Sequence, residues 1–84
     1  MNIQYSRLFI KRYKRLPNAI KLLLVDREIK FKLNPKDPSL KLHQLTGNQK
    51  GFYSFSVNYQ YRVIVAMEAD GFTFINVGTH EIYK

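Results

Sequence analysis

The chain has 84 residues, which suffices for one domain with a single small core and is too short for two. It contains no cysteine, which excludes disulfides and thiolate metal sites, and it has no apolar run of about 18 residues for a membrane span. Because its first residues lack the apolar segment of a signal peptide, we expect no secretory leader. The formal net charge of +8 favours a polyanionic partner, with nucleic acid first and an acidic protein second. The alternative is a surface that is merely well solvated. We expect one cytoplasmic domain over residues 1–84 that has no membrane partner.

The first half of the chain predicts a short strand at residues 3–5 and then two helices. Ser6 is the expected N-cap of the first helix, which runs to about Leu16 with apolar residues at helical spacing. Pro17 interrupts this helix and opens the second. The core-facing stripe of the second helix consists of Ile20, Leu23, Leu24, Arg27 and Phe31. Asn34-Pro35 ends that helix, because a residue before proline avoids the helical conformation.

The second half predicts a turn, an irregular stretch and three strands. The turn covers residues 36–39, and the irregular stretch runs to residue 51. Alternating strands follow at residues 52–58, 61–67 and 72–79. The predicted fold class is therefore α+β: an N-terminal strand, a helical hairpin and a three-stranded antiparallel meander, with the helices packed on one face of the sheet.

Period-two alternation assigns the two faces of this sheet. The residues expected to face the helices are Tyr53, Phe55, Val57, Tyr61, Val63, Val65, Ile75 and Val77. The residues expected on the opposite, more polar face are Ser54, Ser56, Arg62, Ile64, Asn76 and His80. This arrangement predicts that Arg62 and His80 share one surface, with Tyr83 just beyond them.

These residues fit cleavage of RNA without a metal or a cofactor. The six acids are scattered and the two histidines have no metal-ligand spacing, so neither two-metal nor zinc chemistry is indicated. Arg62 suits stabilisation of charge on the transition state, and His80 suits proton transfer as acid or base. Tyr83 is suited to orient a group, donate a proton or stack on a base. Lys41 and Lys50 are expected to hold the RNA backbone.

Each of these residues also has a purely structural interpretation. Arg62 suits a surface ion pair, and His80 suits a strand end where backbone groups satisfy its ring. His43 suits a loop position without a function. Tyr83 suits a C-terminal aromatic residue that packs over the sheet.

Several segments together resemble the RelE/ParE superfamily of bacterial toxins, in the pattern of its YafQ-like members. The resemblance covers nearly the full length of the chain, and the order and spacing of the segments carry it. They are Phe9-Ile10-Lys11-Arg12-Tyr13-Lys14-Arg15-Leu16-Pro17, Asn34-Pro35, Asp37-Pro38-Ser39-Leu40, His43-Gln44-Leu45-Thr46-Gly47, Tyr61-Arg62-Val63-Ile64 and Val77-Gly78-Thr79-His80.

The resemblance implies the toxin of a type II toxin–antitoxin pair, a ribosome-dependent mRNA endoribonuclease that a cognate acidic antitoxin neutralises. By resemblance, Arg62 contacts the scissile phosphate, His80 is the general acid, and His43 lies at the active site. Tyr83 falls near a C-terminal aromatic residue of the family. Lysines of some members are replaced here by Ser54 and Ser56, so lysine-based proton transfer does not carry over. We expect these two serines, with Lys41 and Lys50, to contact RNA.

Two other functions remain open at the level of sequence. ParE members share the fold and inhibit DNA gyrase instead of cutting RNA, so a gyrase inhibitor without catalysis is the main alternative. The pairing of Arg62 with His80 favours the nuclease. A basic domain that only binds RNA is the third possibility, and it predicts salt-sensitive binding without strand scission.

Overall fold

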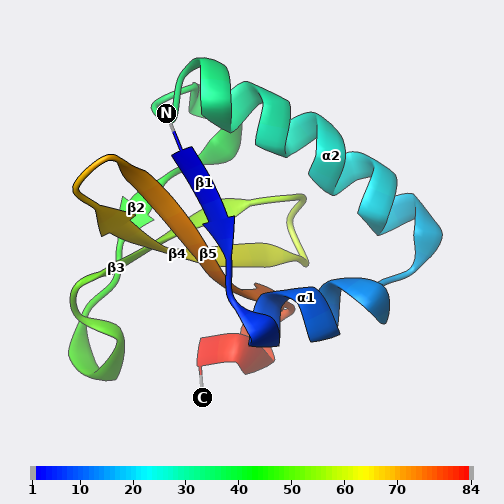
Figure 1. Cartoon of the computed structure of the whole chain (residues 1–84). Helices are drawn as coiled ribbons and strands as arrows, with labels where there is room; N and C mark the ends of the chain where they lie inside the picture. The colour runs from blue at the N-terminus through cyan, green and yellow to red at the C-terminus, as the bar shows by residue number, and fades with distance from the viewer. Residues whose placement is uncertain (1, 84) are drawn as a thin grey trace.

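In the computed structural model, which describes residues 2–83, two helices cover one face of a five-stranded sheet (Figure 1). Three short 3₁₀ turns, η1 to η3, complete the fold. The elements in chain order are β1 (Asn2–Tyr5), α1 (Arg7–Lys14), α2 (Asn18–Leu33), η1 (Pro38–Leu40), β2 (His43–Gln44), η2 (Gly47–Gln49), β3 (Phe52–Ser56), β4 (Arg62–Glu68), β5 (Gly71–Gly78) and η3 (His80–Tyr83). None of the helices formed by these residues is long and apolar enough to cross a membrane.

The strands lie in the order β1-β5-β4-β3-β2. The predicted α+β class and the antiparallel meander of β3, β4 and β5 are confirmed. Two features of the sheet differ from the prediction. β1 pairs with β5 in parallel, which makes the sheet mixed, and a fifth strand, β2, lies beside β3 where an irregular stretch was expected. A strand of two residues has no alternation to detect, so the sequence pattern did not reveal it.

The ends of the helices follow the sequence signals closely. Ser6 is the N-cap of α1, because its Oγ accepts a hydrogen bond from the Phe9 N–H at 3.0 Å. Pro17 is the N-cap residue of α2 instead of its first helical residue. The second helix ends at Leu33, where Asn34 turns into an extended conformation before Pro35, as predicted.

The core consists largely of phenylalanine rings between α2 and the sheet. Phe31 of α2 is fully buried, with its ring centroid 5.0 Å from that of Phe55 on β3 and 5.6 Å from that of Phe74 on β5. Leu24 lies seven residues, or about two turns, earlier on α2 and is also buried. Arg27, on the same stripe, donates from Nε to the Val57 carbonyl at 3.1 Å. The predicted stripe of α2 therefore does face the sheet, and its arginine ties the helix to the end of β3.

One predicted face assignment is wrong because β5 contains a bulge. Ile64 pairs with Asn76 and Val65 pairs with Phe74, which leaves Ile75 as an extra residue. A bulge reverses the alternation along its strand. Phe74 therefore faces the helices before the bulge and Val77 faces them after it, while Ile75, predicted to be a core residue, is not part of the core cluster.

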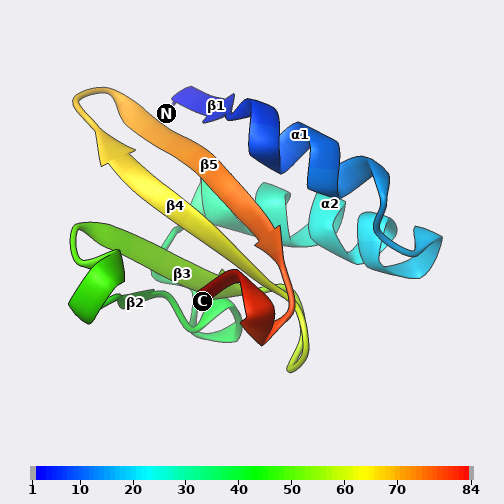
Figure 2. The ribbon, with the colours of Figure 1, turned by 90° about the horizontal axis from the view of Figure 1, so that it is seen from below.

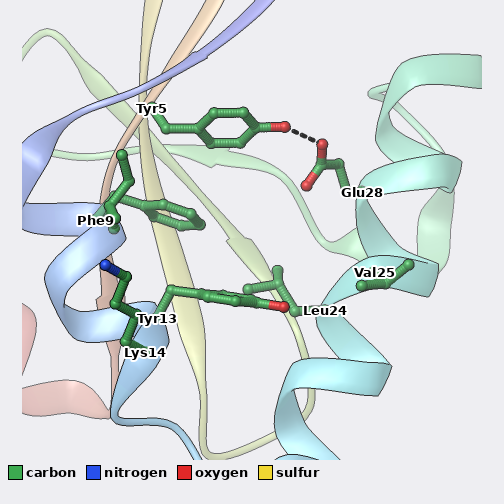
Figure 3. A pocket seen from close by; sticks show the side chains of 8 residues that line it. Tyr5, Phe9, Tyr13, Lys14, Leu24, Val25 and Glu28 are labelled. Carbon is green, nitrogen blue, oxygen red and sulfur yellow. Dashed lines mark hydrogen bonds between the residues drawn. The ribbon is translucent and has the colours of Figure 1, made fainter.

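An apolar cleft of about 290 Å³ separates α1 from α2 on the helical side of the molecule. Figure 3 shows its walls, which include Tyr5, Phe9, Tyr13, Leu24, Val25 and Glu28. The Tyr5 hydroxyl donates a hydrogen bond to the Glu28 carboxylate across this cleft. Burial raises the pKa of the Tyr5 phenol to about 12, and the hydrogen bond and charge of Glu28 act in the same direction.

Candidate functional site

The C-terminal turn η3 covers the face of the sheet that the helices leave free. Figure 1 shows α2 on one side of the sheet and η3 on the other, and Figure 2 gives the same arrangement from below. Ile82 is only 6% exposed, and a Cβ added at Gly78 would lie 2.6 Å from its Cγ2 atom. A larger residue at this position would therefore force Ile82 to move where β5 passes under η3. The strand predicted to continue to residue 79 ends at this glycine, and the chain turns back over the sheet.

A hydrogen bond between two side chains anchors this turn. The Tyr83 hydroxyl lies 2.6 Å from Ser54 Oγ, and Ser54 is fully buried in the middle of β3. Ser56, two residues along, is 6% exposed and donates to the Asn58 carbonyl at 2.7 Å. The two serines predicted to contact RNA thus use their hydroxyls inside the protein and lie beneath the surface.

Arg62 lies at the start of β4, on the face covered by η3. It pairs in register with Ser56 on one side and with Gly78 on the other, while the neighbouring Val63 faces the core. The ion pairs among residues 2–83 all belong to α2, namely Arg27–Asp26, Lys30–Asp26 and Lys32–Glu28. The guanidinium of Arg62 therefore has no carboxylate partner within this range. The surface ion pair that was the structural alternative for Arg62 is not observed there.

His80 is exposed as the first residue of η3. Strand alternation does not determine its orientation, contrary to the prediction, because β5 has already ended at Gly78. Its ring centroid lies 6.0 Å from that of Tyr83, with the planes tilted by 52°. Between residues 2 and 83 no hydrogen bond or ion pair joins His80 to Arg62. The structure thus places both residues beside η3 without bringing them into direct contact.

His43 lies at the outer edge of the same sheet, on β2, where it pairs in register with Ser54. Its Nδ1 lies 3.1 Å from the Lys41 carbonyl oxygen. Because a carbonyl only accepts, Nδ1 carries the proton in this hydrogen bond, and Nε2 of the neutral ring is left as an acceptor. In this tautomer Nε2 is the nitrogen that can act as a general base.

The two lysines predicted to hold RNA are exposed near this edge. Lys41 precedes β2 and adopts a left-handed conformation with φ of 51°. Lys50 follows η2 in the connection to β3. The two lysines therefore lie on the chain segments that precede β2 and β3. No group of three histidine, cysteine or acidic side chains within residues 2–83 is arranged to hold a metal ion.

Sequence reasoning missed Gly78 and Ile82, the residues that hold η3 in place. The available signal was an isoleucine in a four-residue segment directly after a glycine-terminated strand. Alternation alone does not distinguish a strand end from a turn that folds back over the sheet, so the turn after residue 79 was not predicted. The contact between Ser54 and Tyr83 spans 29 residues and has no local pattern.

The hydrogen bond between Ser54 and Tyr83 is expected to stabilise η3 cooperatively. Tyr83→Phe leaves the buried Ser54 hydroxyl without its partner and should lower the free energy of unfolding by about 1–3 kcal/mol. Ser54→Ala should cost a similar amount, and the double variant should cost little more than either single one. A double-mutant cycle from urea unfolding curves measures this coupling. Strictly additive losses would show that the two hydroxyls do not interact.

The comparisons with known proteins concern the fold. No family model matches the sequence, and no curated protein matches it. Solved structures do match. YafQ from E. coli strain BL21(DE3) is 23% identical, with 98% of this chain and 96% of that chain covered and a TM-score of 0.72. A YoeB/ParE toxin from Agrobacterium tumefaciens is 16% identical, with coverages of 95% and 99% and a TM-score of 0.78.

A third matching structure is a complex of two proteins. The E. coli DinJ-YafQ complex matches with 25% identity, coverages of 96% and 94% and a TM-score of 0.68. The fold is thus that of RelE/ParE-like toxins. Within that class the chain is similar to YafQ and YoeB over nearly its whole length and theirs. The resemblance predicted from the sequence is confirmed at the level of the fold.

Proposed function

We propose that the chain is the toxin of a type II toxin–antitoxin system and cleaves mRNA on the ribosome as a metal-independent endoribonuclease. The observation that carries the proposal is the surface around η3. There the guanidinium of Arg62, which has no carboxylate partner within residues 2–83, and the exposed ring of His80 lie on separate elements. The likeness of the fold to YafQ and YoeB supports it. The net charge of +8 supports a polyanionic substrate.

The mechanism assigns one role to each of three side chains. His43 Nε2 accepts the proton of a ribose 2′-hydroxyl, whose oxygen then attacks the adjacent phosphorus. Arg62 stabilises the negative charge that develops on the phosphate oxygens. His80 gives a proton to the departing 5′-oxygen. The bond between phosphorus and that oxygen breaks, which leaves a 2′,3′-cyclic phosphate and a 5′-hydroxyl.

The remaining predicted residues support this chemistry. Tyr83 positions η3 through Ser54, so we assign it to placing His80 instead of transferring a proton itself. Ser56 pairs in register with Arg62 at the start of β4, and its hydroxyl donates to the Asn58 carbonyl in the connection between β3 and β4. Lys41 and Lys50 are exposed and free to contact backbone phosphates beside His43.

A cognate acidic antitoxin is the proposed protein partner. The DinJ-YafQ complex and a YoeB-YefM complex from Staphylococcus aureus have the same fold in their toxin chains. The excess of 14 lysines and arginines over 6 acids favours a partner of opposite charge.

The experiment that tests the function compares two targets in parallel. The purified chain is added to a reconstituted translation reaction, and cleavage of the mRNA is mapped by primer extension. In the second reaction it is added to DNA gyrase in a supercoiling assay. We expect mRNA cleavage that depends on translating ribosomes and unaffected supercoiling. Inhibited gyrase with intact mRNA would contradict the nuclease function and support a gyrase inhibitor. If the chain binds RNA but neither cuts mRNA nor inhibits gyrase, it is an RNA-binding domain without catalysis.

A further inference from the structure

A second basic surface borders η3 on the side opposite to β2. It is a groove of about 460 Å³ lined by α1 and the end of β5. Figure 1 shows α1 beside the C-terminal segment. One wall comes from α1 and the segment after it, with Leu8, Lys11, Arg12, Arg15 and Leu16. The other wall comes from Gly78, Thr79, Glu81 and Ile82. The candidate site described above uses none of the cations in this groove.

The cations of the first wall share one helical face by their spacing. Leu8, Arg12 and Arg15 lie at positions i, i+4 and i+7, with Lys11 at i+3, which places them on one stripe of the helix. The first acid of the chain is Asp26, and the ion pairs between residues 2 and 83 are confined to α2. No ion pair within residues 2–83 therefore joins Lys11, Arg12 or Arg15 to a carboxylate.

The second wall connects the groove to the candidate site. Thr79 lines the groove and His80 follows it directly at the start of η3. An RNA strand in the groove therefore passes next to the segment that carries His80. Glu81 is a carboxylate in the lining and limits how much negative charge the groove attracts.

We propose that this groove is a binding site for the backbone phosphates of RNA, with Arg12 and Arg15 as the phosphate ligands and Lys11 as an additional cation. Arginine presents a planar set of donors that matches a phosphate group. The inference rests on the proposed function for the identity of the polyanion as RNA. An acidic protein segment is less favoured as the occupant, because the groove leads to His80 and two of its three cations are arginines.

The test uses two variants of the same helix that lose equal charge. R12Q/R15Q removes both phosphate ligands, while R7Q/K14Q removes two exposed cations of α1 that do not line the groove. The probe is a fluorescein-labelled 12-nucleotide single-stranded RNA with 2′-O-methyl riboses, which cannot be cut because the attacking hydroxyl is blocked. Fluorescence anisotropy gives its affinity over a range of NaCl concentrations, and circular dichroism checks that both variants fold.

We expect R12Q/R15Q to reduce the magnitude of the slope of log affinity against log salt concentration by about 1.4. Each phosphate contact on a single strand contributes about 0.7 to that slope. R7Q/K14Q should leave the plot close to that of the wild type. Equal losses of RNA affinity in both variants would show that only the overall charge matters, and would contradict a phosphate-binding role for the groove. An unchanged RNA affinity of R12Q/R15Q, with lost binding to poly-glutamate, would assign the groove to a protein partner instead.

The same probe separates this inference from the proposed function. If the wild type fails to cut mRNA while R12Q/R15Q still loses probe binding, the nuclease is wrong and the groove stands. If mRNA is cut and the R12Q/R15Q variant binds like the wild type, the groove is wrong and the nuclease stands.

Discussion

Arg62→Gln is expected to lower the rate of mRNA cleavage by about 10²–10³, the usual loss when one donor to a developing oxyanion is removed. Glutamine keeps much of the length of the side chain and removes its charge. Arg62 has no carboxylate partner among residues 2–83, so its substitution breaks no ion pair there. The fold should survive, and the loss should appear in the chemical step. Single-turnover cleavage on programmed ribosomes measures it.

Two companion variants sharpen the result for Arg62. Arg62→Lys keeps a positive charge without the planar donor pair, so it should recover part of the lost rate and less than all of it. Lys32→Gln removes an exposed cation of α2 on the other side of the sheet and should cleave at the wild-type rate. A full rate for Arg62→Gln, or an equal loss for Lys32→Gln, would contradict the role assigned to Arg62.

Phe31→Ala is expected to lower the free energy of unfolding by about 3–5 kcal/mol. The Phe31 ring is fully buried, and its centroid lies 4.8 Å from that of Phe72 and 5.0 Å from that of Phe55. A domain of this size has a total stability of roughly 5–12 kcal/mol, so the loss approaches the whole. The cavity would lie between α2 and the sheet, where no other side chain of the helix can fill it without leaving its own contacts.

The matched control for Phe31 lies on the same helix. Leu33 is 82% exposed, so Leu33→Ala truncates a large apolar side chain without opening a cavity and should change the stability by less than about 0.5 kcal/mol. Urea unfolding followed by circular dichroism compares the two variants. Similar midpoints for Phe31→Ala and the wild type would show that the phenylalanine cluster does not hold α2 on the sheet.

The sequence pattern predicted the parts of the fold that repeat with a period. The apolar spacing of α2 identified Leu24 and Phe31 as core residues, and Ser6 and Asn34 marked the helix ends correctly. The meander followed from alternation. Prediction failed where the period breaks: β2 is too short to alternate, and the bulge at Ile75 exchanges the faces of β5.

The candidate site was predictable in part for the same reason. Arg62 lies within a regular strand, and alternation placed it correctly on the face opposite the helices. The position of His80 depends instead on η3, which folds back because Gly78 gives room for Ile82 and because Tyr83 reaches Ser54. Those contacts join distant parts of the chain and leave no local signal in the sequence.

The most direct test of the proposed mechanism is the chemistry of the ends that the chain leaves on mRNA. mRNA is cut on translating ribosomes by the wild type and by His80→Gln, and the fragments are analysed for their terminal groups. The account predicts a 2′,3′-cyclic phosphate and a 5′-hydroxyl for the wild type, with cleavage by His80→Gln slowed by about 10²–10⁴. A 5′-phosphate on the wild-type fragments, or full-rate cleavage by His80→Gln, would contradict it.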